Sequence, residues 1–152
     1  MNFPVRHAVL AFTLAFGASA ALAQATSPVG LWKTVDDGTK KDKSLVRISE
    51  SGGVFSGKVE KIVDPDAPKD AVCKDCTDDR KDKPVLGMTI IKNMKQSVDD
   101  KAAYEGGEIL DPNNGKVYKS KLKLVDGGAR LDVRGFIGLA VFGRTQTWSR
   151  VE

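Results

Sequence analysis

Apolar and polar positions alternate with the period of β-strands along most of the chain. The clearest case is the segment 118–124, in which uncharged residues alternate with three lysines. Such alternation places the uncharged side chains on one face of a strand and the lysines on the other. The pattern predicts eight strands, near residues 31–35, 44–50, 54–62, 86–92, 103–110, 116–125, 129–136 and 140–151.

Short turn signals separate several of these segments. Gly52-Gly53 and Asp126-Gly127-Gly128 are examples, and such short joins imply antiparallel neighbours. No long amphipathic helix pattern is present. Eight consecutive antiparallel strands form either a sandwich or an up-and-down barrel, and the hairpin-like joins favour the barrel. The predicted fold class is therefore all-β, with a single eight-stranded antiparallel up-and-down barrel.

The N-terminal residues follow a different pattern. Arg6, an apolar run over 8–16 and small residues ending at Ala23 predict a secretory signal peptide at 1–23. We expect a flexible lead at 24–29 and the barrel domain at 30–152. The protein is accordingly expected to be exported, either to the periplasm or to the medium. No later apolar run reaches the length of a membrane span.

Histidine is confined to the predicted signal peptide, because the only one in the chain is His7. Its absence from residues 24–152 excludes catalysis by a histidine base or by a histidine-activated nucleophile. Since no other catalytic motif is present, we predict a non-enzymatic protein without catalytic residues or cofactors. The net charge of +4 is modest, and lysines are spread along the chain beside many aspartates. This pattern is typical of a solvated surface rather than a nucleic-acid-binding face.

Residues 64–84 form one long predicted loop, which contains three prolines and both cysteines. Cys73 and Cys76 are expected to form a local disulfide in an oxidising compartment. A thioredoxin-type redox pair is the alternative, although the neighbouring aspartates disfavour the thiolate that it requires. No metal site is predicted, because structural zinc sites usually use four Cys or His ligands and the aspartates lack the spacing of a calcium loop.

Gly30-Leu31-Trp32 opens the first predicted strand, and Arg150 lies in the last. This arrangement resembles the calycin signature of lipocalins and fatty-acid-binding proteins. The resemblance implies that Trp32 closes one end of the barrel while Arg150 packs across its ring in a cation–π contact. Both side chains are interpreted as stabilising the fold.

A wider resemblance covers about residues 29–151. The segments 105–118, 133–138 and 144–150 resemble the family of exported bacterial proteins called domain of unknown function 2147, as do the cysteine pair and Leu86-Gly87-Met88. Tyr104 stands where that family has a tryptophan. The resemblance implies a lipocalin-like barrel and no established activity.

The last predicted strand offers polar contacts for a ligand. With regular alternation, Arg144 and Gln146 share a face with Trp148. If that face points inward, Arg144 requires either a paired carboxylate or a bound anion. Arg144 and Gln146, joined by Arg134 and Tyr118, are therefore the predicted ligand-binding residues.

Two other arrangements of Arg144 are open at this point. Its guanidinium pairs internally with Glu108 or Asp132, or this end of the strand faces solvent near the rim. In either case Arg144 has no part in binding a ligand.

Three functions from different classes follow from these residues. The first is an exported, non-enzymatic protein that holds a small apolar or anionic amphipathic ligand inside the barrel. The second is a structural protein with a filled barrel, whose loop at 64–84 contacts a protein partner in the cell envelope. The third and least favoured is a redox module that uses Cys73 and Cys76.

Overall fold

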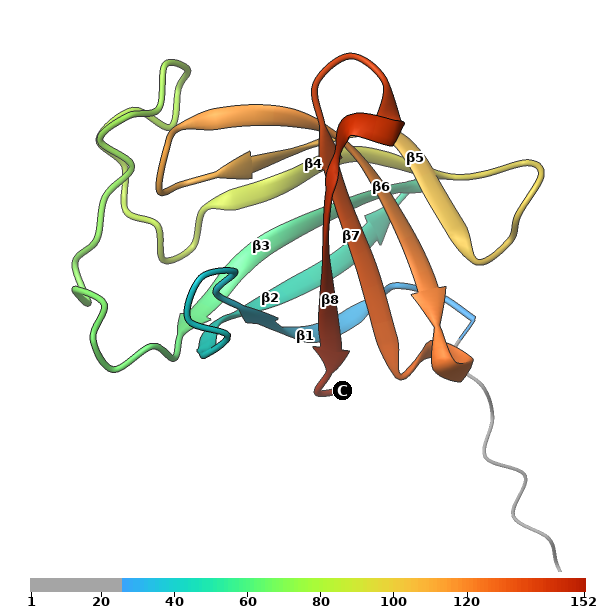
Figure 1. Cartoon of the computed structure of the whole chain (residues 1–152), viewed down its shortest axis with the longest axis horizontal. Helices are drawn as coiled ribbons and strands as arrows, with labels where there is room; N and C mark the ends of the chain where they lie inside the picture. The colour runs from blue at the N-terminus through green and yellow to red at the C-terminus, as the bar shows by residue number, and fades with distance from the viewer. Residues whose placement is uncertain (1–25) are drawn as a thin grey trace, which may run out of the picture.

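The structure is a computed structural model that describes residues 26–152; the predicted signal peptide lies outside the described residues. Eight antiparallel strands form a closed barrel in which each strand pairs with the next and the last pairs with the first (Figure 1). Short 3-10 helices occupy two of the connections. The elements are β1 (Gly30–Val35), β2 (Asp42–Ser51), β3 (Val54–Ile62), β4 (Thr89–Gln96), β5 (Ala103–Asp111), β6 (Lys116–Val125), η1 (Asp126–Gly128), β7 (Arg130–Phe136), η2 (Ala140–Phe142) and β8 (Arg144–Arg150).

The predicted all-β, eight-stranded antiparallel barrel is confirmed, and two strand boundaries need correction. β4 begins at Thr89 rather than near residue 86, because Gly87 adopts a left-handed turn with φ of 83°. The strand then continues past Asn93, whose φ of 61° breaks the alternation that marks a strand in sequence. β8 begins at Arg144, since residues 140–142 form η2. Among residues 26–152, no helix has the length and apolar composition needed to cross a membrane.

The closed end of the barrel is built around Trp32, whose side chain is completely buried. Arg150 lies over this ring, with its Cζ 4.2 Å from the ring centroid. Its guanidinium also donates three hydrogen bonds of 2.7–2.9 Å, to the backbone carbonyls of Ser27, Val29 and Gly128. Trp32 Nε1 donates to the carbonyl of Pro28 at 2.7 Å. The described part of the expected flexible lead is thus held against the barrel by these bonds.

Large apolar side chains fill the half of the barrel next to this closed end. Phe55 packs edge-on against Tyr104, with ring centroids 4.8 Å apart. Gly107 allows β5 to approach β4, because a Cβ at this position would overlap the Lys92 carbonyl and the Met94 sulfur. The other fully buried members of this layer include Val46, Ile48, Met94, Leu122 and Leu131.

Replacing Arg150 tests the closed end. Arg150→Met keeps the apolar length of the side chain but removes three hydrogen bonds to carbonyls and the cation–π contact. We expect the free energy of unfolding, measured by urea denaturation, to fall by about 2–4 kcal/mol. Arg130→Met is the matched control, because Arg130 is about half exposed and pairs only with Asp126 among the described residues. Equal losses in the two variants would contradict this role for Arg150.

Candidate functional site

The other half of the barrel is hollow. A cavity of about 970 Å³ opens where the β1–β2, β3–β4, β5–β6 and β7–β8 connections meet. Its wall inside the barrel is mainly apolar and is formed by Val59, Ile90, Ile109, Leu110, Val133 and Trp148. The second hypothesis from the sequence requires a barrel filled by its own side chains. The cavity shows that this half of the barrel is not filled.

Small inward residues leave this space open. Gly135 of β7 lies beside Tyr118 of β6 and Ile109 of β5, and a Cβ at this position would meet each at an ordinary distance of 3.5 Å. Thr34 and Ser44 are the inward residues of β1 and β2 at this level, and their hydroxyl groups hydrogen-bond to each other at 2.9 Å. Their mutual bond satisfies the polar atoms, so this part of the wall accepts apolar contact.

A chain of polar contacts runs from the cavity wall to its mouth along β8. Trp148 Nε1 donates to Gln146 Oε1 at 3.0 Å, and Gln146 Nε2 donates to Asp37 Oδ2 at 2.7 Å. Arg144 Nη1 lies 2.9 Å from the same oxygen of Asp37, and Arg144 Nη2 lies 3.9 Å from Asp111 Oδ2. The guanidinium therefore reaches the mouth already compensated by two carboxylates.

The predicted ligand-binding residues divide between the two faces of the barrel wall. Arg144, Gln146 and Tyr118 line the cavity together, so β8 has the alternation expected from its sequence. Arg134 lies apart from the cavity lining: its guanidinium donates to the carbonyls of Ala140 and Val141 and to Thr145 Oγ1. Binding of a ligand by these residues remains a prediction.

The internal partners of Arg144 differ from the two considered from the sequence. Asp132 accepts a hydrogen bond from Thr147 Oγ1 at 2.6 Å, and both residues lie on the outward face of their strands. Glu108 is paired in register with Lys119 of β6. Asp37 and Asp111, by contrast, lie at the ends of strands that meet at the mouth. Their contact with Arg144 was not predicted from the sequence, because aspartates in turns usually accept hydrogen bonds from their own backbone.

Negative charge exceeds positive charge around the mouth. Asp36 is held in the β1–β2 turn by hydrogen bonds from the backbone amides of Thr39 and Gly38, which lower the pKa of its carboxyl group. The lining residues comprise four carboxylates (Asp36, Asp37, Asp64 and Asp111) and two cations (Lys43 and Arg144). The mouth thus carries an excess of two negative charges, and a ligand that enters the cavity passes these charges.

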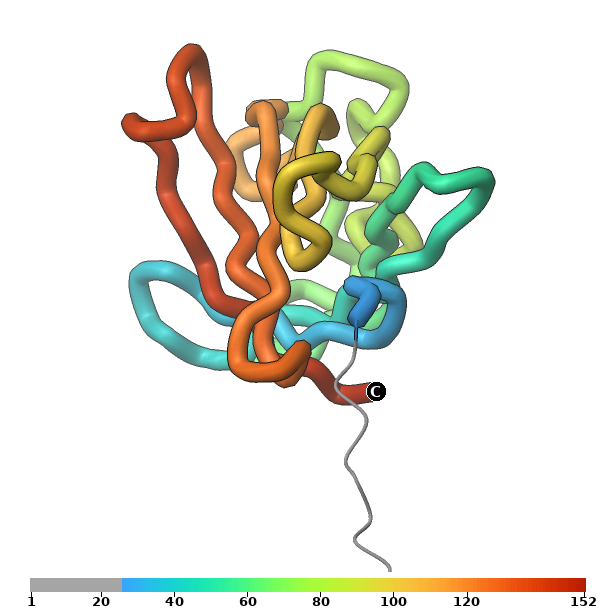
Figure 2. The backbone as a smooth tube through the Cα atoms, turned by 90° about the vertical axis from the view of Figure 1, so that its right-hand side faces the viewer, coloured from blue at the N-terminus to red at the C-terminus, as the bar shows by residue number. Residues whose placement is uncertain are grey.

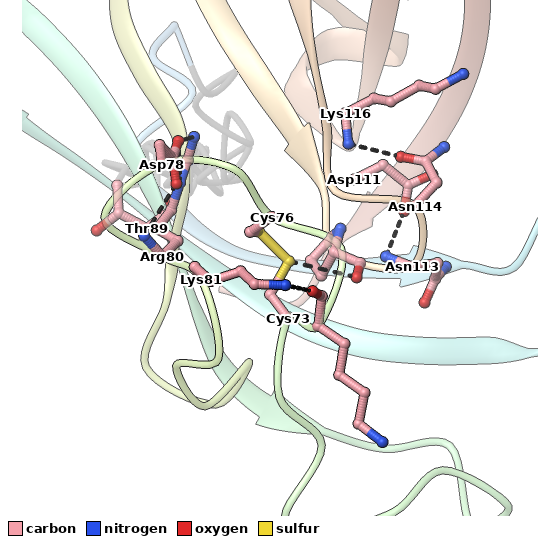
Figure 3. Close-up of a disulfide and its surroundings, with 12 residues drawn as sticks. Cys73, Cys76, Asp78, Arg80, Lys81, Thr89, Asp111, Asn113, Asn114 and Lys116 are labelled. Atoms are coloured by element: carbon pink, nitrogen blue, oxygen red, sulfur yellow. Dashed lines mark hydrogen bonds and ion pairs between the residues drawn. A yellow bond between two sulfur atoms is a disulfide. The ribbon is translucent and has the colours of Figure 1, made fainter.

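The β3–β4 connection forms one side of the mouth through Asp64, Ala67, Ala71 and Val85. It is held in shape by the bridge between Val72 and Pro84 and by the Cys73–Cys76 disulfide, which confirms the predicted bond (Figure 3). The two cysteines are 0% and 1% exposed. A buried disulfide is a poor substrate for thiol exchange, so its position favours a structural role over a redox role.

Arg80 ties this connection to the barrel. Its side chain donates to the Thr89 carbonyl at 3.0 Å and to both carboxylate oxygens of Asp78, although the residue is only 6% exposed (Figure 3). The hydrogen bonds from Arg80 lower the pKa of Asp78 to about 2. Within residues 26–152, no group of three or more His, Cys, Asp or Glu side chains is arranged to hold a metal ion.

Comparison with known proteins agrees with this architecture. A family model described as "Uncharacterized protein conserved in bacteria (DUF2147)" matches residues 30–150. The solved structure of protein HP1028 from the human pathogen Helicobacter pylori, described as belonging to the lipocalin family, superimposes with a TM-score of 0.71. The two chains are 22% identical, and the match covers 83% of this chain and 84% of HP1028. Among curated proteins, none matches the chain. The structural likeness shows that the fold is a lipocalin-like barrel.

The Asp78–Arg80 pair should make the wall of the mouth sensitive to acid. Because folding lowers the pKa of Asp78 from 3.8 to about 2, its contribution is fully present above pH 3.8 and is lost as pH falls toward 2. Asp78→Asn should lower the free energy of unfolding by about 1 kcal/mol at neutral pH, a value reduced by partial exposure of the carboxylate. The difference from wild type should shrink as pH falls through this window.

Urea denaturation at several pH values measures this difference. Asp79→Asn is the matched control, because Asp79 is the exposed neighbour of Asp78, and we expect its stability to follow that of the wild type. A difference between wild type and Asp78→Asn that stays constant from neutral pH to pH 2 would contradict the assignment.

Proposed function

The chain belongs to the DUF2147 family of uncharacterized bacterial proteins, and we propose that it is a non-enzymatic binding protein that holds one small apolar or amphipathic molecule in its barrel. The observation that carries this proposal is the cavity of about 970 Å³, which has an apolar wall and an open mouth. Sites for small molecules typically have volumes of roughly 300–1,000 Å³ and a few polar groups near the entrance.

The two ends of the cavity suit the two ends of an amphipathic ligand. Apolar side chains such as Ile90 and Val133 line the interior, where each buried methylene of a ligand contributes about 0.8 kcal/mol. The charged residues lie at the mouth. A ligand therefore fits with its apolar part inside and its polar group between the β1–β2 and β5–β6 connections.

The charge at the mouth favours an amine or an uncharged polar group over the anionic group expected from the sequence. Asp37 and Asp111 already neutralise Arg144, so its guanidinium offers an anion little uncompensated charge. The excess of two negative charges among the lining residues repels a carboxylate and attracts a cation.

Export is part of the proposal. It is supported by the pattern of residues 1–23 and by the Cys73–Cys76 disulfide, because disulfides persist in oxidising compartments such as the periplasm. A binding role, rather than catalysis, is supported by the absence of histidine from residues 24–152. The side chains of Gln146, Asp37 and Arg144 also bind one another at the mouth.

Filling the cavity should weaken binding. Ala71→Phe and Val133→Phe each place a ring in the cavity, one from the β3–β4 connection and one from the barrel wall. We expect each to raise the dissociation constant of the apolar fluorescent probe N-phenyl-naphthylamine by about tenfold or more. Val98→Phe is the control, because Val98 is 85% exposed and lies at the closed end of the barrel. Equal affinity in all of these folded proteins would overturn the proposal.

The charge of the polar group can be tested by competition. An alkylamine, an alkanol and an alkanoate of equal chain length are compared for displacement of the same probe. The amine should displace it at about tenfold lower concentration than the alkanoate, and Asp37→Asn should reduce this preference. Asp132→Asn removes the same charge from the outer face and should leave the preference unchanged. Displacement that is strongest with the alkanoate would assign Arg144 as an anion site instead.

A further inference from the structure

The connection between β7 and β8 exposes an unusual amount of apolar surface. Ile137, Leu139, Val141 and Phe142 lie within six residues of one another, and each is at least 68% exposed. This connection projects from the rim of the barrel beside the cavity mouth, at the upper left of Figure 2. Ile137 and Phe142 also line the cavity, so the apolar surface continues from the projecting loop into the barrel.

Several backbone polar groups of the loop form hydrogen bonds within the protein rather than with water. Residues 135–143 read Gly-Phe-Ile-Gly-Leu-Ala-Val-Phe-Gly and contain no charged or polar side chain. Within the loop, the amides of Phe142 and Gly143 donate to the carbonyls of Leu139 and Ala140. Arg134 supplies two further hydrogen bonds, at 2.7 Å to the Ala140 carbonyl and 3.1 Å to the Val141 carbonyl. Moving backbone from water into an apolar medium costs less free energy when its polar groups already hydrogen-bond within the protein.

We propose that the β7–β8 connection, which lies beside the cavity mouth, inserts its apolar side chains into the surface of a lipid membrane. This proposal goes beyond ligand binding and does not depend on it. Transfer of side chains such as Leu139 and Val141 from water to the acyl boundary, about 5–10 Å below the surface, is favourable.

The chemistry around the loop favours a membrane over a protein partner. Interfaces between proteins carry hydrogen bonds, and this loop has no side chain that forms one. Two cations lie at its base on the outer side of the barrel instead: Arg134, and Lys119, which is paired in register with Phe136. An apolar tip with cations behind it is the arrangement that binds a surface of anionic lipids.

Sedimentation with vesicles tests the proposal. The wild-type protein is mixed with phosphatidylcholine vesicles, with and without phosphatidylglycerol, and should sediment best when the anionic lipid is present. Leu139→Ser/Val141→Ser should lower the partition coefficient by about tenfold or more, since two apolar side chains are lost from the lipid. Val98→Ser is the matched control, because Val98 is 85% exposed at the opposite end, and it should bind like the wild type.

A fluorescence measurement reports insertion directly. Trp32 and Trp148 are buried, so a tryptophan placed at position 139 is the exposed reporter. Brominated lipids should quench Leu139→Trp strongly beyond the quenching of the wild type, whereas Val98→Trp should show no such increase.

Three results would overturn the proposal. One is wild-type protein that fails to sediment with either kind of vesicle. Another is an equal loss of binding in Leu139→Ser/Val141→Ser and Val98→Ser. The third is self-association in solution that the double substitution abolishes, which would make the loop an interface between two copies. Leu139 and Val141 do not line the cavity, so their substitution should leave binding of the apolar probe in solution unchanged and keeps this test separate from the proposed function.

Discussion

The contact between Arg150 and Trp32 lies at the seam that closes the barrel, because these residues face each other in register where the last strand meets the first. Gly30 makes the contact possible: a Cβ there would lie 2.7 Å from Arg150 Nη1. The same guanidinium binds the chain just before β1 and the turn before β7. A closed sheet has no free edge at which other chains could pair. Backbone hydrogen bonds between the first and last strands close this sheet, and the contact between Arg150 and Trp32 reinforces the same seam.

The two ends of the barrel differ: one is packed with side chains and the other holds the cavity. The large apolar side chains are concentrated near Trp32, and small residues such as Gly135 and Ala71 occupy the opposite half. Four connections meet around the resulting cavity. They are the β1–β2 turn with Asp37, the β3–β4 connection with its disulfide, the β5–β6 turn next to Asp111, and the projecting apolar β7–β8 connection. A polar mouth therefore lies beside an apolar loop and above an apolar cavity.

Much of the barrel could be predicted because its strands alternate regularly. The segments 54–62 and 116–125 were predicted with the boundaries that β3 and β6 have. The predicted start of β4 was wrong because Gly87 adopts a left-handed turn, and its predicted end was too early because a positive φ at Asn93 shifts the alternation. The predicted last strand included the turn at 140–142. The partners of Arg144 could not be predicted, because Asp37 and Asp111 are distant in sequence and only the closed barrel brings them to it. No local sequence pattern predicts contacts between residues so far apart in the chain. Nor does one predict the volume of the cavity that the inward side chains leave empty.

Native mass spectrometry of the protein isolated from its own cells tests the central claim, that the barrel holds a small molecule. We expect a species heavier than the polypeptide, whose additional mass disappears when the same sample is denatured. The mass lost would also begin to identify the ligand. A native mass equal to that of the polypeptide alone, both as isolated and after incubation with a lipid extract of the same cells, would contradict the account.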